Sequence, residues 1–186
     1  MKRATDIVFA SIIFLLTAPL YIPIIIAIWI EGGPAFFVQE RIGKNNKKIY
    51  IAKFRTMTST DNGVFVKGKD MRITKVGSFL RKVRLDELPQ LISVIIGDLS
   101  LIGPRPEASG LIKDFNDKIP YFSVRHFITP GLSGWAQIHQ ELPPRTIEET
   151  ADKLAYDLYY MKNRSVLLDL KISLKTIYTL VSKAGM

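Results

Sequence analysis

The sequence predicts an α+β fold in two parts: an apolar membrane segment over residues 1–33, and a mainly helical domain with a small β-hairpin over residues 34–186. Three observations predict this division. Residues 7–30 carry no charged side chain, and this run exceeds the about 20 residues that a membrane-crossing helix needs. Loop-forming residues at 31–34 end the run. Beyond them, short strand-like runs and amphipathic stretches follow, over a length that is sufficient for one domain with its own core.

The apolar segment contains two prolines and is basic on both flanks. Pro19 and Pro23 each remove a backbone donor, so a helix should kink there. Lys2 and Arg3 precede the segment, and further basic residues follow it between positions 41 and 48. Because basic residues mark the cytoplasmic side of a membrane, both ends are expected there. Two topologies remain open: a kinked helix that crosses the bilayer, which length and composition favour, and a re-entrant helix–break–helix that enters one leaflet and returns.

The remaining residues predict a hairpin followed by helices. Runs at 36–38 and 49–54 are strand-like and flank a turn at 43–46. Residues 58–69 are polar and include glycine, which predicts a surface loop. Helices are predicted at 76–84, 89–96, 108–119, 147–162 and 165–185. Thr146 and Glu149 form a capping box at the start of the fourth of these helices.

The last predicted helix is amphipathic. Its apolar stripe consists of Leu167, Leu170, Leu174, Ile177 and Val181. Such a stripe most often packs into a protein core. In a chain with a membrane segment it could instead lie on the bilayer interface.

Composition limits the chemistry of this chain. It has no cysteine and two histidines, which excludes disulfides, thiolate metal sites and histidine-rich metal sites. The formal net charge is +9. A positive charge of this size predicts anionic partners, whether nucleic acid, nucleotide phosphates or an anionic membrane surface. The apolar N-terminal segment favours the membrane.

Asp86 and Glu87 form the most informative pair in the chain. They are adjacent at a predicted helix start, with Arg81 and Arg84 just upstream and Arg105 just downstream. An acid pair among cations suits phosphoryl chemistry, because one carboxylate can attack or hold a metal while the cations balance phosphate charge. The positive end of the helix should keep Asp86 ionised. The alternative is that the two acids only cap a helix.

Four basic residues are candidate phosphate ligands. Arg105 lies between two prolines that fix its backbone, and guanidinium groups match phosphate oxygens well. Lys53 and Arg55 alternate along a predicted strand, so they share one face. Arg81 is the fourth candidate. For all four the alternative is a structural ion pair or a solvated surface charge. Lys2 and Arg3 suit lipid headgroups, although the same residues fit a general topology signal.

Motifs along nearly the whole chain resemble one family. They are KR-x-x-D at 2–6, F-x-Q-x-R-x-G at 37–43, KFRTM at 53–57, LDELPQL at 85–91, GDLSLIGPRP at 97–106, PGLSGWAQ at 130–137, YDLYY at 156–160 and LDLKI at 168–172. In this order they resemble the monotopic phosphoglycosyl transferases, which are bacterial sugar transferases. The DELPQL and GPRP motifs are the most specific of the series.

The resemblance implies a re-entrant helix and a two-step reaction. Asp86 would attack a UDP-sugar, releasing UMP and leaving a phosphosugar on the enzyme. A membrane polyprenol phosphate (undecaprenyl phosphate) would then accept the phosphosugar, as the first membrane step of bacterial glycan assembly. Glu87 would help to bind Mg²⁺ together with Asp86, and assistance in proton removal or acceptor placement is a further role that the resemblance allows. The implied location is the bacterial inner membrane, with the catalytic domain on the cytoplasmic face. Two polyanionic substrates at an anionic nucleophile do require a divalent cation and several basic residues.

Some features remain open or depart from the resemblance. Thr129 stands where a basic residue usually precedes Pro-Gly, and Arg125 is the candidate to replace that charge. Asp157 and Asp169 are interpreted as structural pairing or capping residues. A nucleic-acid-binding module is disfavoured because no recognition motif accompanies the charge. A catalytically silent scaffold is disfavoured by the intact acid pair. The sugar and the oligomeric state stay open, and a homodimer is possible.

Overall fold

The computed structural model describes residues 2–58, 72–140 and 144–184, with the side chains of residues 181, 183 and 184 left out. The predicted loop at 58–69 lies outside the described residues except for Thr58. Within the described part, helices predominate and two small sheets accompany them. The predicted α+β class is therefore confirmed.

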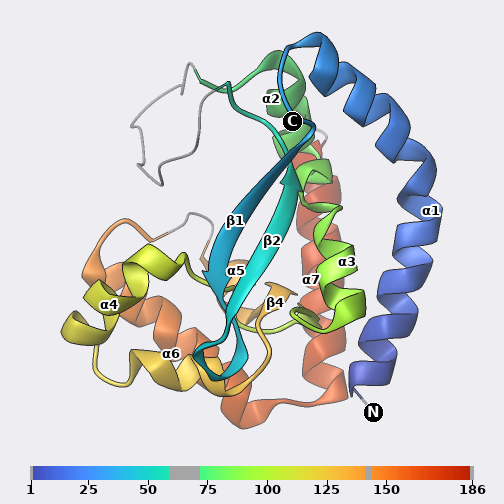
Figure 1. Ribbon diagram of the computed structural model, residues 1–186. Helices are drawn as coiled ribbons and strands as arrows, with labels where there is room; N and C mark the ends of the chain where they lie inside the picture. Colours follow the sequence, from blue (N-terminus) through green and yellow to red (C-terminus); the bar gives the residue numbers. More distant parts are fainter. Residues whose placement is uncertain (1, 59–71, 141–143, 185–186) are drawn as a thin grey trace.

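The N-terminal segment is one helix, α1 (Lys2–Ile30). Pro19 and Pro23 lie inside it, so the predicted break between two helices is instead a bend, visible in Figure 1. Each proline removes a single N–H while the flanking turns keep their hydrogen bonds. The Thr17 hydroxyl donates to the Ile13 carbonyl at 2.8 Å. By length and composition α1 could cross a membrane.

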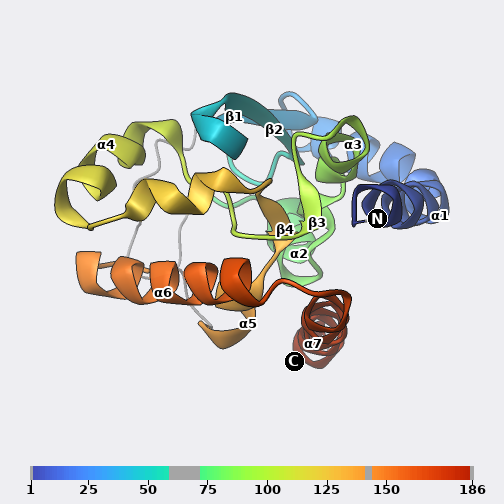
Figure 2. The same cartoon turned by 90° about the horizontal axis from the view of Figure 1, so that it is seen from below.

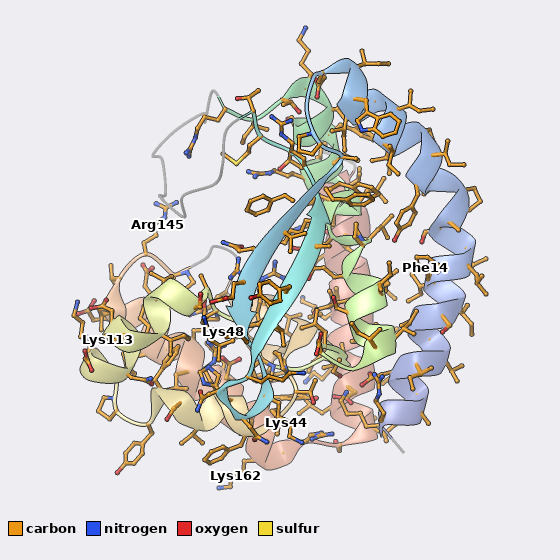
Figure 3. All side chains as sticks on the ribbon, viewed as in Figure 1. Phe14, Lys44, Lys48, Lys113, Arg145 and Lys162 are labelled. Carbon is orange, nitrogen blue, oxygen red and sulfur yellow. The ribbon has the colours of Figure 1, made fainter. Side chains whose placement is uncertain are left out.

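Both ends of α1 are fixed to the same body. Near its start, buried Asp6 accepts a 2.8 Å hydrogen bond from the Ser100 hydroxyl. Just after its end, Glu31 accepts from the Val76 backbone N–H at 3.0 Å. Between these points Phe14 faces α3 (Gln90–Ile96), as Figure 3 shows. The opposite side of α1 stays exposed, with Leu16 at 76%.

The predicted hairpin is confirmed and is longer than expected. Strands β1 (Phe36–Ile42) and β2 (Lys48–Phe54) pair antiparallel, with Phe37 opposite Lys53. A short 3₁₀ turn at Lys44–Asn46 joins them, with positive φ at Asn45 and Asn46. Asparagine adopts this conformation more readily than most residues. The inner face of the hairpin packs into the core through Ile49 and Ile51.

The other elements follow in chain order: α2 (Lys75–Lys82), the 3₁₀ turn η2 (Leu85–Glu87), α3, β3 (Ser100–Ile102), α4 (Ser109–Lys118), the 3₁₀ segment η3 (Phe122–Phe127), β4 (Gly131–Ser133), α5 (Trp135–His139), α6 (Ile147–Asn163) and α7 (Val166–Ala184). Strands β3 and β4 form a parallel pair that the sequence pattern did not predict. The Thr146 cap of α6 is confirmed, because its side chain accepts from the Glu149 N–H. Seen from below in Figure 2, α1, α3 and α7 lie at one end of the molecule, and α4 and α6 at the other.

Helix α7 exposes its apolar stripe. Leu167, Leu170, Leu174 and Ile177 are each more than half exposed, and Val181 lies among the side chains left out. Ile172 on the other face is fully buried and holds the helix to Ile102 and Tyr160. Core packing of the stripe is therefore wrong, because the helix buries a different face. A place on the bilayer interface stays a prediction for this stripe.

Candidate active site

A cavity of about 570 Å³ contains all six residues predicted as catalytic or phosphate-binding. It opens between the hairpin, α2, η2 and the loop after β3. The residues that line it are Pro34, Phe36, Phe37, Gln39, Arg41, Lys53, Phe54, Arg55, Thr56, Met57, Thr58, Arg81, Arg84, Asp86, Glu87 and Arg105. The sequence therefore predicted one site from side chains that lie far apart along the chain.

The acid pair lies in η2, ahead of α3 and not within its first turn. Arg84 precedes the turn with left-handed backbone angles, φ 59° and ψ 19°. Pro89 is the N-cap of α3, so the predicted helix at 89–96 begins at Gln90 instead. Because the tightened turn separates Asp86 from the helix, the predicted support of its charge by the α3 terminus is wrong; the macrodipole acts only near the terminal turn.

Glu87 is the anion around which the cavity cations gather. Lys53 Nζ donates to Glu87 Oε1 at 2.9 Å, and Arg105 donates to both carboxylate oxygens. Burial disfavours the charge of Glu87, but Arg105 and Lys53 outweigh it and hold its pKa far below the usual range. Glu87 is therefore ionised and engaged on both oxygens.

Asp86 has the opposite environment. It is 9% exposed, and its Oδ1 has no hydrogen-bond partner in the described part of the chain. Burial and the neighbouring charge of Glu87 raise its pKa, against the opposing effect of Lys53, Arg84 and Arg81. A buried carboxylate oxygen without a partner is costly. Since no described group competes for this buried oxygen, its lone pairs remain for a phosphorus atom or metal ion that reaches it.

Two of the predicted phosphate ligands make contacts within the protein. Arg81 Nε donates to Thr56 Oγ1 at 2.8 Å. Each nitrogen of the Arg55 guanidinium donates to a backbone carbonyl: Nε to Met57 at 2.7 Å, and the two terminal nitrogens to Gly32 and Thr58 at 2.8 Å. Arg55 thus ties the end of the membrane segment to the cavity wall, and its phosphate role stays a prediction.

A buried ion network fixes the loop that carries Arg105. Arg125 donates to the Arg105 carbonyl at 2.8 Å, to Asp157 at 2.7 Å and to Glu107 at 2.9 Å. Lys153 also donates to Glu107. Arg125 is only 3% exposed, so its predicted role as a replacement phosphate cation is wrong: its guanidinium is occupied by two internal carboxylates and a backbone carbonyl. The structural role predicted for Asp157 is confirmed.

Lys2 and Arg3 also make internal contacts. Lys2 Nζ pairs with Asp169 at 2.7 Å, and Arg3 donates to the carbonyls of Val94 and Ile95 at the end of α3. These bonds join the start of α1 to α7 and α3. They confirm the pairing role of Asp169. Contact of the two basic residues with lipid headgroups stays a prediction.

Of the acid pair, Asp86 fits a magnesium ligand better than Glu87. Within residues 2–58, 72–140 and 144–184, no group of three or more His, Cys, Asp or Glu side chains could form a complete protein site. Mg²⁺ commonly takes only one or two carboxylates and completes its shell with substrate phosphates and water. The unpartnered Oδ1 of Asp86 meets that requirement, whereas both Glu87 oxygens already accept from cations.

Several cavity residues were not singled out as ligands from the sequence. Gln39 and Arg41 share the cavity face of β1 with Phe37, and their alternation in the F-x-Q-x-R motif was the available signal. Arg41 donates to the Gln39 side chain and to the Pro106 carbonyl at 3.1 Å. Arg84 lies two residues before Asp86, and this position in the sequence was the clearest signal for its place in the cavity.

Fold and site together define a class. A long apolar helix is fixed to an α+β domain, and the domain's cavity sets two adjacent carboxylates among basic side chains. A helix of this length and composition could cross a membrane, and carboxylates set among basic side chains are a combination suited to phosphate-bearing ligands. More particularly, the chain belongs to the bacterial sugar transferase family, whose model matches residues 1–183.

Characterised relatives cover the whole chain. It is 42% identical over its full length to a UDP-N-acetylgalactosamine-undecaprenyl-phosphate N-acetylgalactosaminephosphotransferase of Aeromonas hydrophila, where it spans 44% of the relative. It is 40% identical to the UDP-glucose:undecaprenyl-phosphate glucose-1-phosphate transferase of Escherichia coli K12, spanning 41% of that protein. The chain thus covers less than half the length of these two relatives. It also matches an exopolysaccharide production protein of Rhizobium leguminosarum at 37% identity, covering 95% of this chain and 93% of the relative.

Proposed function

We propose that this protein transfers a sugar-1-phosphate from a UDP-sugar to undecaprenyl phosphate, through a covalent phosphosugar on Asp86. The products are UMP and an undecaprenyl-diphosphate-linked sugar. Two relatives named for this type of transfer, with different sugars, support the reaction type. They leave the sugar of this protein open.

One observation carries the proposal: the Asp86 carboxylate has an unpartnered oxygen in a cavity lined by basic side chains. A carboxylate that only caps a helix would spend that oxygen on a backbone N–H. The neighbouring Glu87 gathers Lys53 and Arg105 close to Asp86. The two acids therefore have separate roles: Asp86 is the nucleophile, and Glu87 positions the basic side chains.

In the first step, an oxygen of ionised Asp86 forms a bond to the sugar-proximal phosphorus of the donor. The bond from that phosphorus to the bridging oxygen breaks, and UMP leaves with the electron pair. In the second step, a phosphate oxygen of undecaprenyl phosphate attacks the same phosphorus, and the Asp86 carboxylate departs unchanged. Lys53, Arg81 and Arg105 line the cavity where negative charge gathers in both steps.

Asp86, through its free oxygen, would hold Mg²⁺, and Glu87 would lie beside it. When bound, the ion neutralises phosphate charge and lowers the electrostatic barrier to anion attack on an anion. The basic residues held by Glu87, Lys53 and Arg105, would offset phosphate charge as well. Both charge sources are needed because donor and acceptor are each anionic.

The anchoring of α1 supports a re-entrant topology. Its first turns bond to β3 through Asp6 and its end bonds to α2 through Glu31, so both ends belong to one globular body. That body is too polar to enter a bilayer, and a helix fixed to it at both ends enters and leaves on one face. Both flanks are basic, which supports a cytoplasmic location for this face, where soluble UDP-sugars are available. The proposed location is therefore the cytoplasmic face of the bacterial inner membrane.

Intact-protein mass spectrometry tests the covalent step. The protein is exposed to UDP-glucose or UDP-N-acetylgalactosamine with Mg²⁺ and without lipid acceptor. We expect a phosphosugar adduct on the wild type, its loss on adding undecaprenyl phosphate, and no adduct on Asp86→Asn. UMP release without any adduct would refute the covalent route. Absence of both adduct and UMP with a wide range of UDP-sugars would refute the proposed reaction.

A further inference from the structure

The basic side chains of the cavity differ in how many hydrogen bonds their N–H groups already make within the protein. Lys53 and Arg105 donate to Glu87. Arg55 donates to three backbone carbonyls, and Arg81 donates through Nε to Thr56. In the described part of the chain, these side chains are all partly committed to the fold.

Arg84 lines the same cavity and has no such commitment. Its backbone N–H donates to the Arg81 carbonyl, and its own carbonyl accepts from Glu87. Arg84 is an exposed residue, and its guanidinium makes no hydrogen bond to any other residue that the structure describes, although its charge acts on nearby Asp86. An unengaged guanidinium keeps its full planar set of donors for a phosphate.

The backbone at Arg84 strengthens this interpretation. Its φ of 59° lies in the left-handed region, which glycine adopts at little cost and a long side chain adopts with strain. The position is the N-cap of the turn that carries Asp86 and Glu87. Strained residues of this kind concentrate at functional sites, where the surrounding structure holds them in place. The strained backbone thus holds an unengaged cation two residues from the proposed nucleophile.

We propose that Arg84 is a phosphate ligand of this site, the cation that engages substrate instead of the protein. The proposal rests on the proposed function for its substrates, and either of them could supply the phosphate: the diphosphate of the donor or the monophosphate of the lipid acceptor. Both present anionic oxygens that a guanidinium can contact in a bidentate manner.

The first test is equilibrium binding of UDP, which carries the diphosphate but has no sugar to transfer. The protein is the full chain in lipid nanodiscs with Mg²⁺. Arg84→Gln should weaken UDP binding about tenfold, and Arg84→Lys should be intermediate. Lys82→Gln is the matched control, because Lys82 is an exposed neighbour that does not line the cavity. It should bind within about twofold of the wild type.

The second test separates the two phosphate sources. If Arg84 binds the acceptor, UDP binding stays unchanged in Arg84→Gln, while the KM for undecaprenyl phosphate rises about tenfold in turnover. Either pattern supports a phosphate ligand and identifies its source. If Arg84→Gln and Lys82→Gln match the wild type in both measurements, the proposal is overturned.

Arg84→Gly separates ligand binding from a structural role. Glycine fits the left-handed backbone, so its thermal midpoint should equal or exceed that of the wild type while phosphate binding weakens as in Arg84→Gln. A lower midpoint with unchanged phosphate binding would show that the arginine only stabilises the turn. Arg84-dependent UDP binding in a wild type that forms no adduct would refute the proposed function but not this assignment.

Discussion

Glu87 and Arg105 are joined by two hydrogen bonds, and Arg105 is in turn held through its own carbonyl by Arg125. The acid beside the proposed nucleophile is thereby connected to the buried ion network of α6. The partners also reinforce each other's charge, because Glu87 raises the pKa of Arg105, and Arg105, with Lys53, lowers that of Glu87 against burial.

Replacing Glu87 with glutamine should therefore damage both stability and activity. Lys53 and Arg105 would lose the carboxylate that holds them, and a broken buried pair costs about 3 kcal/mol. Adduct formation should fall by about 100-fold or more, because the displaced cations no longer face the phosphate. Thermal unfolding and adduct kinetics measure the two effects. Asp98→Asn, outside the cavity, is the control; an equal loss there would show that the effect is not specific to the site.

Asp86→Asn should abolish adduct formation and make the protein more stable. The substitution removes a buried carboxylate that lies next to Glu87 and lacks a partner on Oδ1. We expect a gain of about 1 kcal/mol, which raises the thermal midpoint by about 2–4 °C in a chain of this size. Turnover should fall by about 10⁴-fold or more, as for other lost nucleophiles. A lower midpoint would contradict the assignment of Asp86 as an electrostatically unfavourable residue.

The same residue gives a pH dependence of stability with a definite sign. Because the folded pKa of Asp86 is raised above its unfolded value, the folded state binds this proton first as pH falls. The wild type should therefore gain stability relative to Asp86→Asn as pH falls through the folded pKa, and the gap should close below it. Denaturant unfolding of both proteins from pH 7 to pH 4 measures the difference. A constant gap across that range would contradict the raised pKa.

Glu107 should protect the fold against acid. Lys153 and Arg125 outweigh burial and lower its pKa from 4.5 to about 2. Its contribution is fully present above the unfolded pKa and is lost as pH falls from about 4.5 to about 2. Glu107→Gln should cost about 3 kcal/mol at neutral pH and flatten this acid limb. The check is denaturant unfolding at successive pH values, with Glu148→Gln on the surface as control; parallel curves for Glu107→Gln and wild type would contradict the prediction.

His126 should produce a second loss of stability at milder pH. It is 5% exposed, its Nδ1 lies 2.6 Å from Asn46 Oδ1, and burial together with Arg125 lowers its pKa from 6.5 to about 4. The unfolded chain binds the proton first, so stability falls as pH drops from about 6.5 to about 4, by about 3 kcal/mol. His126→Gln should remove this slope, whereas exposed His139→Gln should not. Identical slopes in all three proteins would exclude His126 as the cause.

Local patterns predicted the hairpin and the long helices well. The apolar run at 49–54 is a strand in which Ile49, Ile51 and Phe54 are buried, and Thr146 and Glu149 marked the start of α6 through contacts three residues apart. The acid pair and four basic residues of the cavity, Lys53, Arg55, Arg81 and Arg105, were also predicted, because phosphate chemistry needs those residue types. Each of these features can be predicted from a short stretch of the chain or from the chemistry of single side chains.

Features that depend on distant partners could not be predicted in this way. Strands β3 and β4 are three residues each and become strands only by pairing with one another. In the sequence Arg125 has the pattern of a free cation, but in the fold it pairs with Asp157 and Glu107, which are distant along the chain. Asp86 was expected to gain from a helix terminus, but burial beside Glu87 dominates. In each case the deciding contact joins separate parts of the chain.

The double attachment of α1 has a consequence for the surrounding lipid. A free transmembrane helix adjusts to bilayer thickness by tilting or by sliding its flanks. A bent helix whose two ends are bonded to one body, through Asp6 and Glu31, lacks that freedom. In the proposed re-entrant topology its depth in the bilayer would therefore be set by the protein, and hydrophobic mismatch would have to be absorbed by the lipids. The cavity would keep a constant height above the acyl chains in membranes of different thickness, so a lipid-borne phosphate would meet it at one level.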